Sequence, residues 1–284
     1  AATLPADDSE VLELRRELSV YLHALGQVDL GANLRRSNWE QARSRLGESH
    51  PTTSNLAVAL AQSLVLQGRY DDADALIQPD KAVRRRLWGA DSADFARSLN
   101  LEALVLLGRG NLQAARDTVE QAAGLAAATG SAGALLQATI CASRAAIERQ
   151  SGDLAAAESA IRQAIEPALR HRSSARDFGQ FRTDPLGILR QQGRFEEMPA
   201  LLAEIDRDTE ALPAGHLRRG VVALERAHLE LHRGERAAAR AELARATAII
   251  DASPAQTARD RALVDARELA ARLTAGHGVT HWTC

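Results

Sequence analysis

The sequence predicts an all-α fold of stacked helical hairpins, and three observations predict it. Glycine recurs at a nearly constant spacing, at positions 26, 68, 110, 152, 193 and 234, followed by a polar and then usually an apolar residue. Aromatic residues make up only 3 % of a chain rich in alanine and leucine. No run of β-branched residues indicates a strand. A period of this size is typical of stacked supersecondary units. The six glycines are Gly26, Gly68, Gly110, Gly152, Gly193 and Gly234, and Gly276 follows at the same spacing.

Each of these glycines is expected to end one helix and open the turn to the next, because glycine readily adopts the left-handed backbone conformation. In the second repeat Pro51 suits a first helical turn, and the following apolar residues share one helix face at Ala57, Leu60, Ala61 and Leu64. The expected pairs are 9–25 with 29–45, 51–67 with 71–87, 92–108 with 112–128, 132–151 with 154–170, 175–192 with 195–207 and 214–233 with 236–251, followed by a single helix near 257–274.

The fifth repeat is expected to be irregular. Pro185 lies inside its first helix, where proline removes a backbone hydrogen bond and clashes with the preceding turn, at a cost of about 3 kcal/mol. We therefore predict a kink or break near Thr183. The stretch 170–176 is expected to be the loop that leads into this repeat.

Composition argues against several classes of function. Lys and Arg number 35 and Asp and Glu 37, so the formal net charge of −2 lacks the basic excess of a nucleic-acid-binding protein. No apolar run reaches the roughly 20 residues that a membrane-spanning helix needs. The predicted partners accordingly include no nucleic acid and no membrane insertion.

The cysteines and the chain ends suggest the compartment. Cys141 and Cys284 form no CxxC pair, so a reducing, cytoplasmic environment is expected. The chain begins at Ala1 instead of a methionine, as expected of a piece of a longer protein or of a chain after signal cleavage, and in that case an extracytoplasmic location is open. Residues 1–8 are expected to be a disordered tail and residues 276–284 a flexible one.

The repeat unit resembles the tetratricopeptide repeat (TPR) in its longer, kinesin-light-chain-like form. Small residues recur in the first helix, and glycine is followed by Tyr, Phe or Leu and then alanine. The linker of that subtype resembles Leu46-Gly47-Glu48-Ser49-His50-Pro51, with a degenerate copy that starts at Trp88. The resemblance covers roughly residues 9–275. It implies a single right-handed superhelix, an α-α solenoid of about six hairpins with a C-terminal capping helix.

The resemblance also implies a binding surface. In such arrays the first helices line a concave groove, where Asn and Gln can pair with a peptide backbone and Arg with a carboxylate. Counting back from each turn glycine in the register of the family gives the candidate groove residues Asn55, Gln62, Arg97, Asn100, Thr139, Arg149, Gln180, Arg190, His228 and His232. The alternative for each is an ordinary solvent-facing polar residue.

Other candidate sites are weaker. His228 and His232 have helical spacing, but no HExxH motif accompanies them, and residues 277–284 hold His277, His281 and Cys284 without a fourth ligand. Arg84, Arg85 and Arg86 are expected to complement the dipole at a helix end. Cys141 is expected to be a buried small residue. No catalytic motif is present, so we predict neither an enzyme nor a bound metal or cofactor.

Three functional hypotheses follow. The first is a protein-interaction scaffold that binds a peptide or partner protein in the groove. The second, implied by the resemblance, is the regulatory region of a bacterial serine/threonine kinase or winged-helix transcriptional regulator. The third is a small-molecule or metal receptor that uses the irregular fifth repeat. A monomer is favoured over a homodimer, because the last helix carries the charges of a polar cap at Arg259, Asp260, Arg267 and Glu268.

Overall fold

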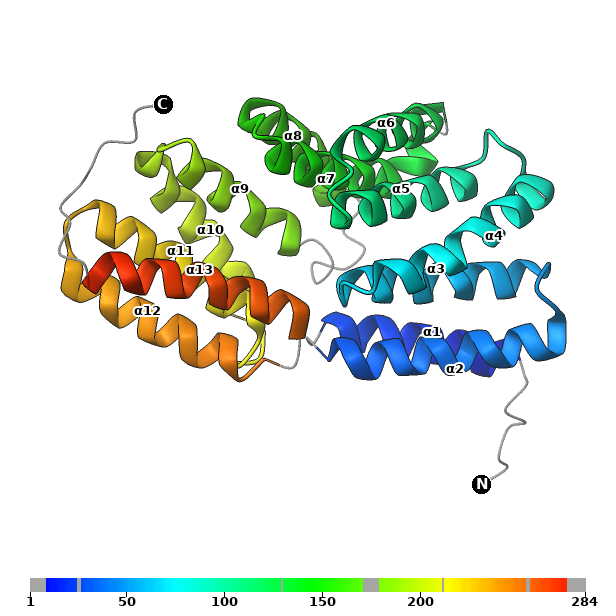
Figure 1. Cartoon of the computed structure of the whole chain (residues 1–284), viewed down its shortest axis with the longest axis horizontal. Coiled ribbons are helices and arrows are strands. Elements are labelled where there is room, and N and C mark those ends of the chain that lie inside the picture. The colour runs from blue at the N-terminus through cyan, green and yellow to red at the C-terminus, as the bar shows by residue number, and fades with distance from the viewer. Residues whose placement is uncertain are drawn as a thin grey trace, which may run out of the picture. The chain divides into compact units, whose positions relative to one another are not determined.

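The prediction of an all-α protein is confirmed. The computed structural model describes residues 9–24, 27–128, 130–170, 179–210, 212–253 and 256–274, and within these ranges it has thirteen α-helices, two 3₁₀ helices and no strand (Figure 1). None of the described helices is both long and apolar enough to cross a bilayer. The chain divides into two compact units, Ala1–Ser173 and Ser174–Cys284. The predicted tails, 1–8 and 276–284, lie outside the described residues.

The first unit consists of four helical hairpins at the predicted spacing. We call the first helix of each hairpin helix A and the second helix B. The pairs are α1 (Ser9–Ala24) with α2 (Val28–Leu46), α3 (Pro51–Leu66) with α4 (Tyr70–Trp88), α5 (Ala93–Gly108) with α6 (Leu112–Ala128), and α7 (Ala134–Ser151) with α8 (Leu154–Arg170). A 3₁₀ turn, η1 (Gly130–Gly133), precedes α7. The repeat is regular to the residue over the first three hairpins, because α1, α3 and α5 begin at equal intervals, at positions 9, 51 and 93.

The turn glycines have the predicted left-handed backbone. Gly68, Gly110, Gly152, Gly193 and Gly234 have φ angles of 72°, 77°, 86°, 73° and 83°. At Gly110 a Cβ atom would meet nothing within 4 Å, so the backbone angle alone requires glycine there. Gly26 and Gly276 lie outside the described residues.

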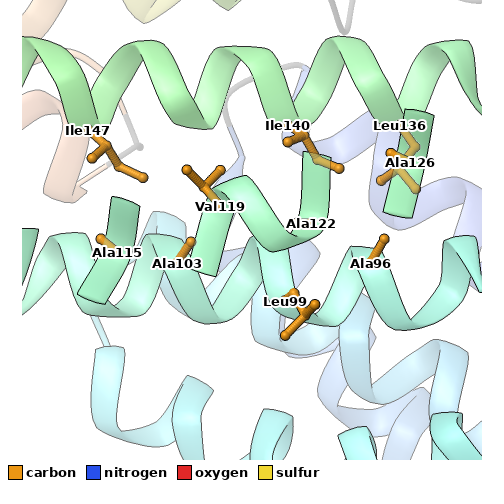
Figure 2. Close-up of a cluster of buried hydrophobic side chains, with 10 residues drawn as sticks. All are labelled: Ala96, Leu99, Ala103, Ala115, Val119, Ala122, Ala126, Leu136, Ile140 and Ile147. Carbon is orange, nitrogen blue, oxygen red and sulfur yellow. The ribbon is translucent and has the colours of Figure 1, made fainter. Parts of the chain in front are cut away.

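In each of the first three hairpins, helix B packs both on its own helix A and on helix A of the next hairpin. The cluster around α6 shows this arrangement, with small residues of α6 between α5 and α7 (Figure 2). Its members are Ala96, Leu99 and Ala103 of α5, Ala115, Val119, Ala122 and Ala126 of α6, and Leu136, Ile140 and Ile147 of α7. Alanines at the contact let the helix axes approach closely, while each buried Leu or Ile stabilises the unit by about 1.5–3 kcal/mol.

The second unit contains the predicted fifth and sixth hairpins and the closing helix. Its elements are α9 (Gly179–Gln191), the 3₁₀ turn η2 (Phe195–Glu197), α10 (Met198–Thr209), α11 (Leu217–His232), α12 (Arg236–Asp251) and α13 (Gln256–Thr274). The predicted helix at 195–207 thus opens with a 3₁₀ turn, and its α-helix starts at Met198.

We predicted a kink or a break near Thr183. The break is wrong, because α9 continues through Pro185, and the kink stays a prediction. Packing offsets the cost of the proline. Leu186 and Leu189, which follow the proline, are buried in a cluster with Met198 and Leu202 of α10, and this burial stabilises the helix around it.

A buried polar network joins α1, α2 and α3. His23 Nδ1 lies 2.8 Å from the Ser19 carbonyl oxygen and therefore donates to it, so Nε2 of the neutral ring accepts from the Ser63 hydroxyl at 3.0 Å. Arg35 donates to the hydroxyl oxygens of Ser19 and Ser63 and to the Ala59 carbonyl. Burial and the neighbouring Arg35 charge lower the pKa of His23 from 6.5 to about 4, although its hydrogen bond to Ser19 opposes this shift.

The neutral His23 predicts a loss of stability in mild acid. Its pKa is lower in the folded than in the unfolded chain, so the unfolded state binds the extra proton and stability falls as the pH drops from 6.5 to about 4. The shift corresponds to at most about 3 kcal/mol, and partial contact with water reduces the expected loss to about 2 kcal/mol. Urea denaturation at several pH values should show a smaller acid effect in His23→Asn than in the unmodified chain. Parallel losses in both proteins would contradict the assignment.

The turn geometry predicts opposite effects for two Gly→Ala substitutions. Gly110→Ala forces a side chain into a left-handed conformation and should lower the free energy of unfolding by about 1 kcal/mol. Gly124 is an exposed helical residue of α6 with open space around it, so Gly124→Ala should raise the same quantity by about 0.5–1 kcal/mol. Thermal denaturation followed by circular dichroism measures both, and the prediction fails if the two substitutions shift stability in the same direction.

Candidate functional site

A pocket in the first unit brings together three of the predicted groove residues. It has a volume of about 480 Å³ and is lined by residues of the three helices A α1, α3 and α5, with one residue of α4. Asn55 and Gln62 of α3 and Arg97 of α5 all line it. The other lining residues are Leu12, Arg16, Thr52, Leu56, Val58, Ala59, Arg84 and Asp94.

The repeat places these side chains on one surface. Asn55 and Gln62 are separated by about two helical turns, so they share one face of α3. Arg97 occupies the position in its repeat that Asn55 occupies in the preceding one, and α5 contacts α3 directly. Equivalent positions of neighbouring helices A therefore form the pocket wall.

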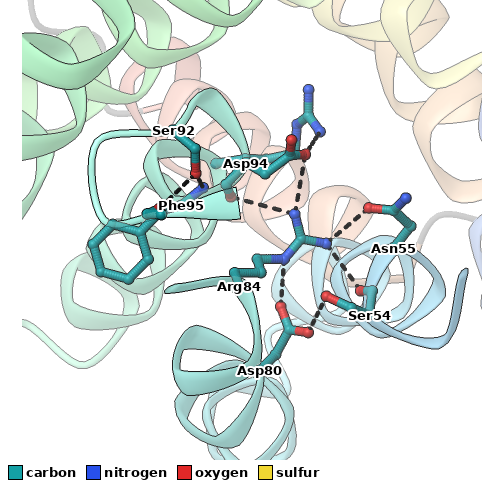
Figure 3. A network of polar contacts seen from close by, with 9 residues as sticks. Ser54, Asn55, Asp80, Arg84, Ser92, Asp94 and Phe95 are labelled. Carbon is teal, nitrogen blue, oxygen red and sulfur yellow. Dashed lines mark hydrogen bonds and ion pairs between the residues drawn. The ribbon is translucent and has the colours of Figure 1, made fainter. Parts of the chain in front are cut away.

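Arg84 of α4 ties this region together. It is fully buried, and its Nε donates to Asp80 Oδ2 at 2.6 Å. Nη2 donates to the Ser54 carbonyl and to Asn55 Oδ1, both at 3.0 Å, while Nη1 is 3.3 Å from Asp94 Oδ1 (Figure 3). One guanidinium thus connects α4 to both neighbouring helices A, α3 and α5.

This network determines which groups the pocket can offer a ligand. The oxygen of Asn55 is occupied by Arg84, so its amide nitrogen is the group left to donate. Arg97 is 48 % exposed and donates to Asp94 Oδ1 at 3.1 Å. Burial lowers the pKa of the Arg97 guanidinium, Asp94 opposes that shift and Arg84 adds to it, and the group still stays charged at neutral pH.

Arginine is the most frequent charged residue in the lining of the pocket. Three arginines line it, Arg16, Arg84 and Arg97, against the single carboxylate of Asp94. Arg84 is largely neutralised by Asp80, whereas Arg97 reaches solvent. The arrangement suits a ligand with a carboxylate or another anionic group.

The sequence analysis did not identify Arg84. We expected Arg84 to be one of three arginines that complement a helix dipole, and this is wrong for Arg84, because it is buried and ion-paired. The pattern that reveals it is the apolar stripe of α4, where Ala73, Ile77, Asp80 and Arg84 follow one another at spacings of four, three and four. A cation and an anion on that stripe predict a buried pair.

The other predicted residues of the first unit lie outside this pocket. Asn100 is 3 % exposed, and its carboxamide oxygen accepts no hydrogen bond within the described part of the chain. Thr139 is half-buried and donates to the Leu135 carbonyl in its own helix. Arg149 is exposed in the last turn of α7.

Two predicted groove residues of the second unit, Arg190 and His228, both bind the carboxylate of Asp265. Arg190 of α9 donates to Glu225 Oε2 and to Asp265 Oδ2, each at 2.9 Å, and His228 Nε2 lies 3.0 Å from Asp265 Oδ1. Burial alone would raise the pKa of the Asp265 carboxyl, but the hydrogen bond with His228 and the charge of Arg190 outweigh it and lower the pKa. The network connects α9, α11 and α13, and the sequence analysis missed Asp265.

His232 belongs to neither network. Its ring stacks on Phe195 of η2, with ring centroids 4.0 Å apart and the planes 7° from parallel. Among the described residues no group of His, Cys, Asp or Glu could hold a metal. The side chain of Gln180 and the tail with His277, His281 and Cys284 lie outside the description. Cys141 is a half-buried free thiol, and burial raises its pKa.

The second unit has a smaller pocket of about 250 Å³ between α10, α11 and α12. Arg226 lines it and binds both carboxylate oxygens of Asp206 through Nη2, at 2.8 and 2.7 Å. None of the predicted groove residues lines this pocket. The pocket of the first unit is therefore the better candidate.

Comparison with known proteins shows the fold. No family model matches the chain, and neither does any curated protein. The structure of the APC/C hetero-tetramer Cut9–Hcn1 covers 89 % of this chain, which covers 43 % of that one, with a TM-score of 0.61 at 13 % identity. The structure of BtubC from P. vanneervenii covers 90 % of this chain, which covers 96 % of that one, with a TM-score of 0.54 at 16 % identity. The structure of a putative kinesin light chain of Podosopora anserina with TPR-like repeats covers 73 % of this chain, which covers 97 % of that one, with a TM-score of 0.49 at 16 % identity. The fold is that of a TPR array.

The buried pair of Arg84 and Asp80 predicts a rescue by double substitution. Arg84→Met leaves the Asp80 carboxylate buried without its cation and should cost about 3–5 kcal/mol of the free energy of unfolding. Adding Asp80→Leu removes the stranded charge, so the double variant should be more stable than Arg84→Met. Urea denaturation of the single and double variants measures this. A double variant as unstable as the sum of the two singles would show that the pair is not coupled.

Proposed function

We propose that this protein is an interaction scaffold that binds an acidic segment of a partner protein in the pocket of the first unit. The observation that carries the proposal is the convergence of Asn55, Gln62 and Arg97 on one pocket whose wall has three arginines and one aspartate. Carboxamides can pair with the donors and acceptors of a peptide backbone, and a guanidinium can pair with a carboxylate.

The dimensions favour an extended peptide. Asn55 and Gln62 are separated by about two helical turns, or about 10 Å along α3. This is roughly the length of three residues in an extended strand. One stretch of peptide backbone can therefore reach both carboxamides while an acidic side chain reaches Arg97.

The volume also limits the kind of ligand. A pocket of about 480 Å³ admits a few side chains but no folded domain. A short segment of a larger protein fits this limit. The hetero-tetrameric assembly of Cut9 with Hcn1 supports a scaffold role, because a protein of similar fold is found there in complex with another protein.

The proposal predicts charge-dependent peptide binding. Short fluorescein-labelled peptides that contain Asp or Glu should bind more tightly than the same peptides with Asn or Gln, measured by fluorescence anisotropy. Arg97→Ala should weaken binding of the acidic peptides by about twofold to fivefold, the value of one partly exposed ion pair. Asn55→Ala with Gln62→Ala should weaken acidic and neutral peptides alike, because it removes backbone pairing. Higher salt should reduce the preference for acidic peptides.

Arg86→Ala is the matched control. Arg86 is an exposed arginine of α4 that does not line the pocket, so its loss changes the net charge equally without changing the site. Equal effects of Arg97→Ala and Arg86→Ala would show that the peptides bind by non-specific electrostatic attraction and not in the pocket. No preference for acidic over neutral peptides would refute the proposed ligand.

A further inference from the structure

The pocket between α10, α11 and α12 in the second unit is lined by charges of both signs. Its volume is about 250 Å³, and it lies at the end of α10, where the chain turns toward α11. The charged residues that line it are Asp206, Glu210, Arg219, Arg226 and Arg245. Complementary charges decide which ligands a site accepts, so a pocket of this kind suits a ligand that carries both signs.

The short second helix of the fifth hairpin places the carboxylates at a helix end. α10 and the preceding η2 contain 12 and 3 residues, whereas α4 and α6, the second helices of their hairpins, contain 19 and 17. α10 ends at Thr209, so Asp206 lies in its last turn and Glu210 follows directly. Arg219 lies in the first turn of the next helix, α11.

The two helix ends add to the separation of charge. The C-terminal end of a helix carries a partial negative charge and favours cations, whereas the N-terminal end favours anions. The pocket therefore offers a cationic group the end of α10 with Glu210, and an anionic group the start of α11 with Arg219.

Arg226 is only partly engaged by its own ion pair. Its Nη2 donates to both carboxylate oxygens of Asp206, at 2.8 and 2.7 Å. Within the described part of the chain its buried Nε has no hydrogen-bond partner, and Nη1 makes no hydrogen bond either. A guanidinium commonly holds a carboxylate through two nitrogens, so this pair leaves Nη1 able to donate to a ligand.

Arg219 and Glu210 line the same pocket without forming an ion pair. Arg219 donates to the Leu212 carbonyl at 3.1 Å, and among the described residues neither Arg219 nor Glu210 has an oppositely charged partner. A simple anion at Arg219 would meet the negative charge of Glu210, and a simple amine at Glu210 would meet the arginines. A ligand with a carboxylate and an ammonium group can pair with both.

We propose that this pocket binds a free α-amino acid. The ligand carboxylate accepts from Arg219 and from Nη1 of Arg226, and the ligand ammonium donates to Glu210. The volume of about 250 Å³ fits a molecule of this size, since pockets for drug-sized ligands measure roughly 300–1,000 Å³. The proposal does not depend on peptide binding, because the two pockets belong to different units and share no residue.

Calorimetric titration of the full chain with each of the common L-amino acids tests the proposal. At least one should bind, and two analogues of that amino acid, one without the ammonium and one without the carboxylate, should each bind about fivefold or more weakly. Inorganic phosphate, a simple anion, should also bind more weakly. Arg219→Gln and Glu210→Gln should each weaken binding of the amino acid by about twofold to fivefold, the value of a partly exposed ion pair. Glu210→Gln should also abolish the preference over the analogue that lacks the ammonium.

Arg207→Gln and Glu204→Gln are the matched controls. Both residues are exposed on α10 and neither lines the pocket, so these variants change the net charge equally without changing the site. They should bind the amino acid like the unmodified chain, and circular dichroism should show full helicity in all four variants. The proposal is overturned if no L-amino acid binds, or if phosphate or the analogue without the ammonium binds as tightly. Binding that is unchanged in both Arg219→Gln and Glu210→Gln would likewise overturn it, by placing the site elsewhere in the chain.

Discussion

The structure of the first unit depends on the packing of each helix A against the helix B that precedes it. This contact explains why the glycine spacing is so regular. Because the same face of each helix A must meet the same face of the preceding helix B, an insertion of one residue would rotate the buried face by about 100°. The alanines at the contact, such as Ala115 and Ala122 of α6, have no exposed surface and hold the two helices close together. The fold is therefore specified by register more than by any large side chain.

Within each hairpin, a contact between helix A and its own helix B keeps its position from repeat to repeat while its chemistry changes. In the first repeat Asn38 donates to the Leu12 carbonyl, and in the second repeat Ser54 donates to Asp80 at the same two positions. In the third repeat both positions are alanine, Ala96 and Ala122, in an apolar cluster. The helix B position of this pair is thus occupied by an amide in Asn38, an ion-paired carboxylate in Asp80 and a methyl group in Ala122. Polar variants connect helices through directed hydrogen bonds, and apolar ones rely on burial.

Most of the fold could be predicted from the sequence, because glycine turns and apolar periodicity are local. The expected helix at 112–128 matches α6 in both bounds, and that at 51–67 matches α3 to one residue. Features that depend on distant partners could not be predicted. Asp265 lies far along the chain from both His228 and Arg190, and Pro185 is tolerated because of contacts with α10. The candidate pocket could be predicted only in part. The register of the repeat predicted Asn55, Gln62 and Arg97, but it did not predict the buried Arg84 that binds Asn55.

Asp94 connects the scaffold to the candidate site. It accepts from Arg84 at 3.3 Å and from Arg97 at 3.1 Å, while Arg84 holds Asp80 more closely at 2.6 Å. In the proposed complex, a ligand carboxylate at Arg97 would compete with Asp94 for that guanidinium. If Arg97 turns to the ligand, Asp94 keeps its contact with Arg84 and also its partial contact with water, so no charge is stranded in a buried position. The proposed binding would therefore replace an internal ion pair with an external one at low cost, while the network around Arg84 connects α3, α4 and α5.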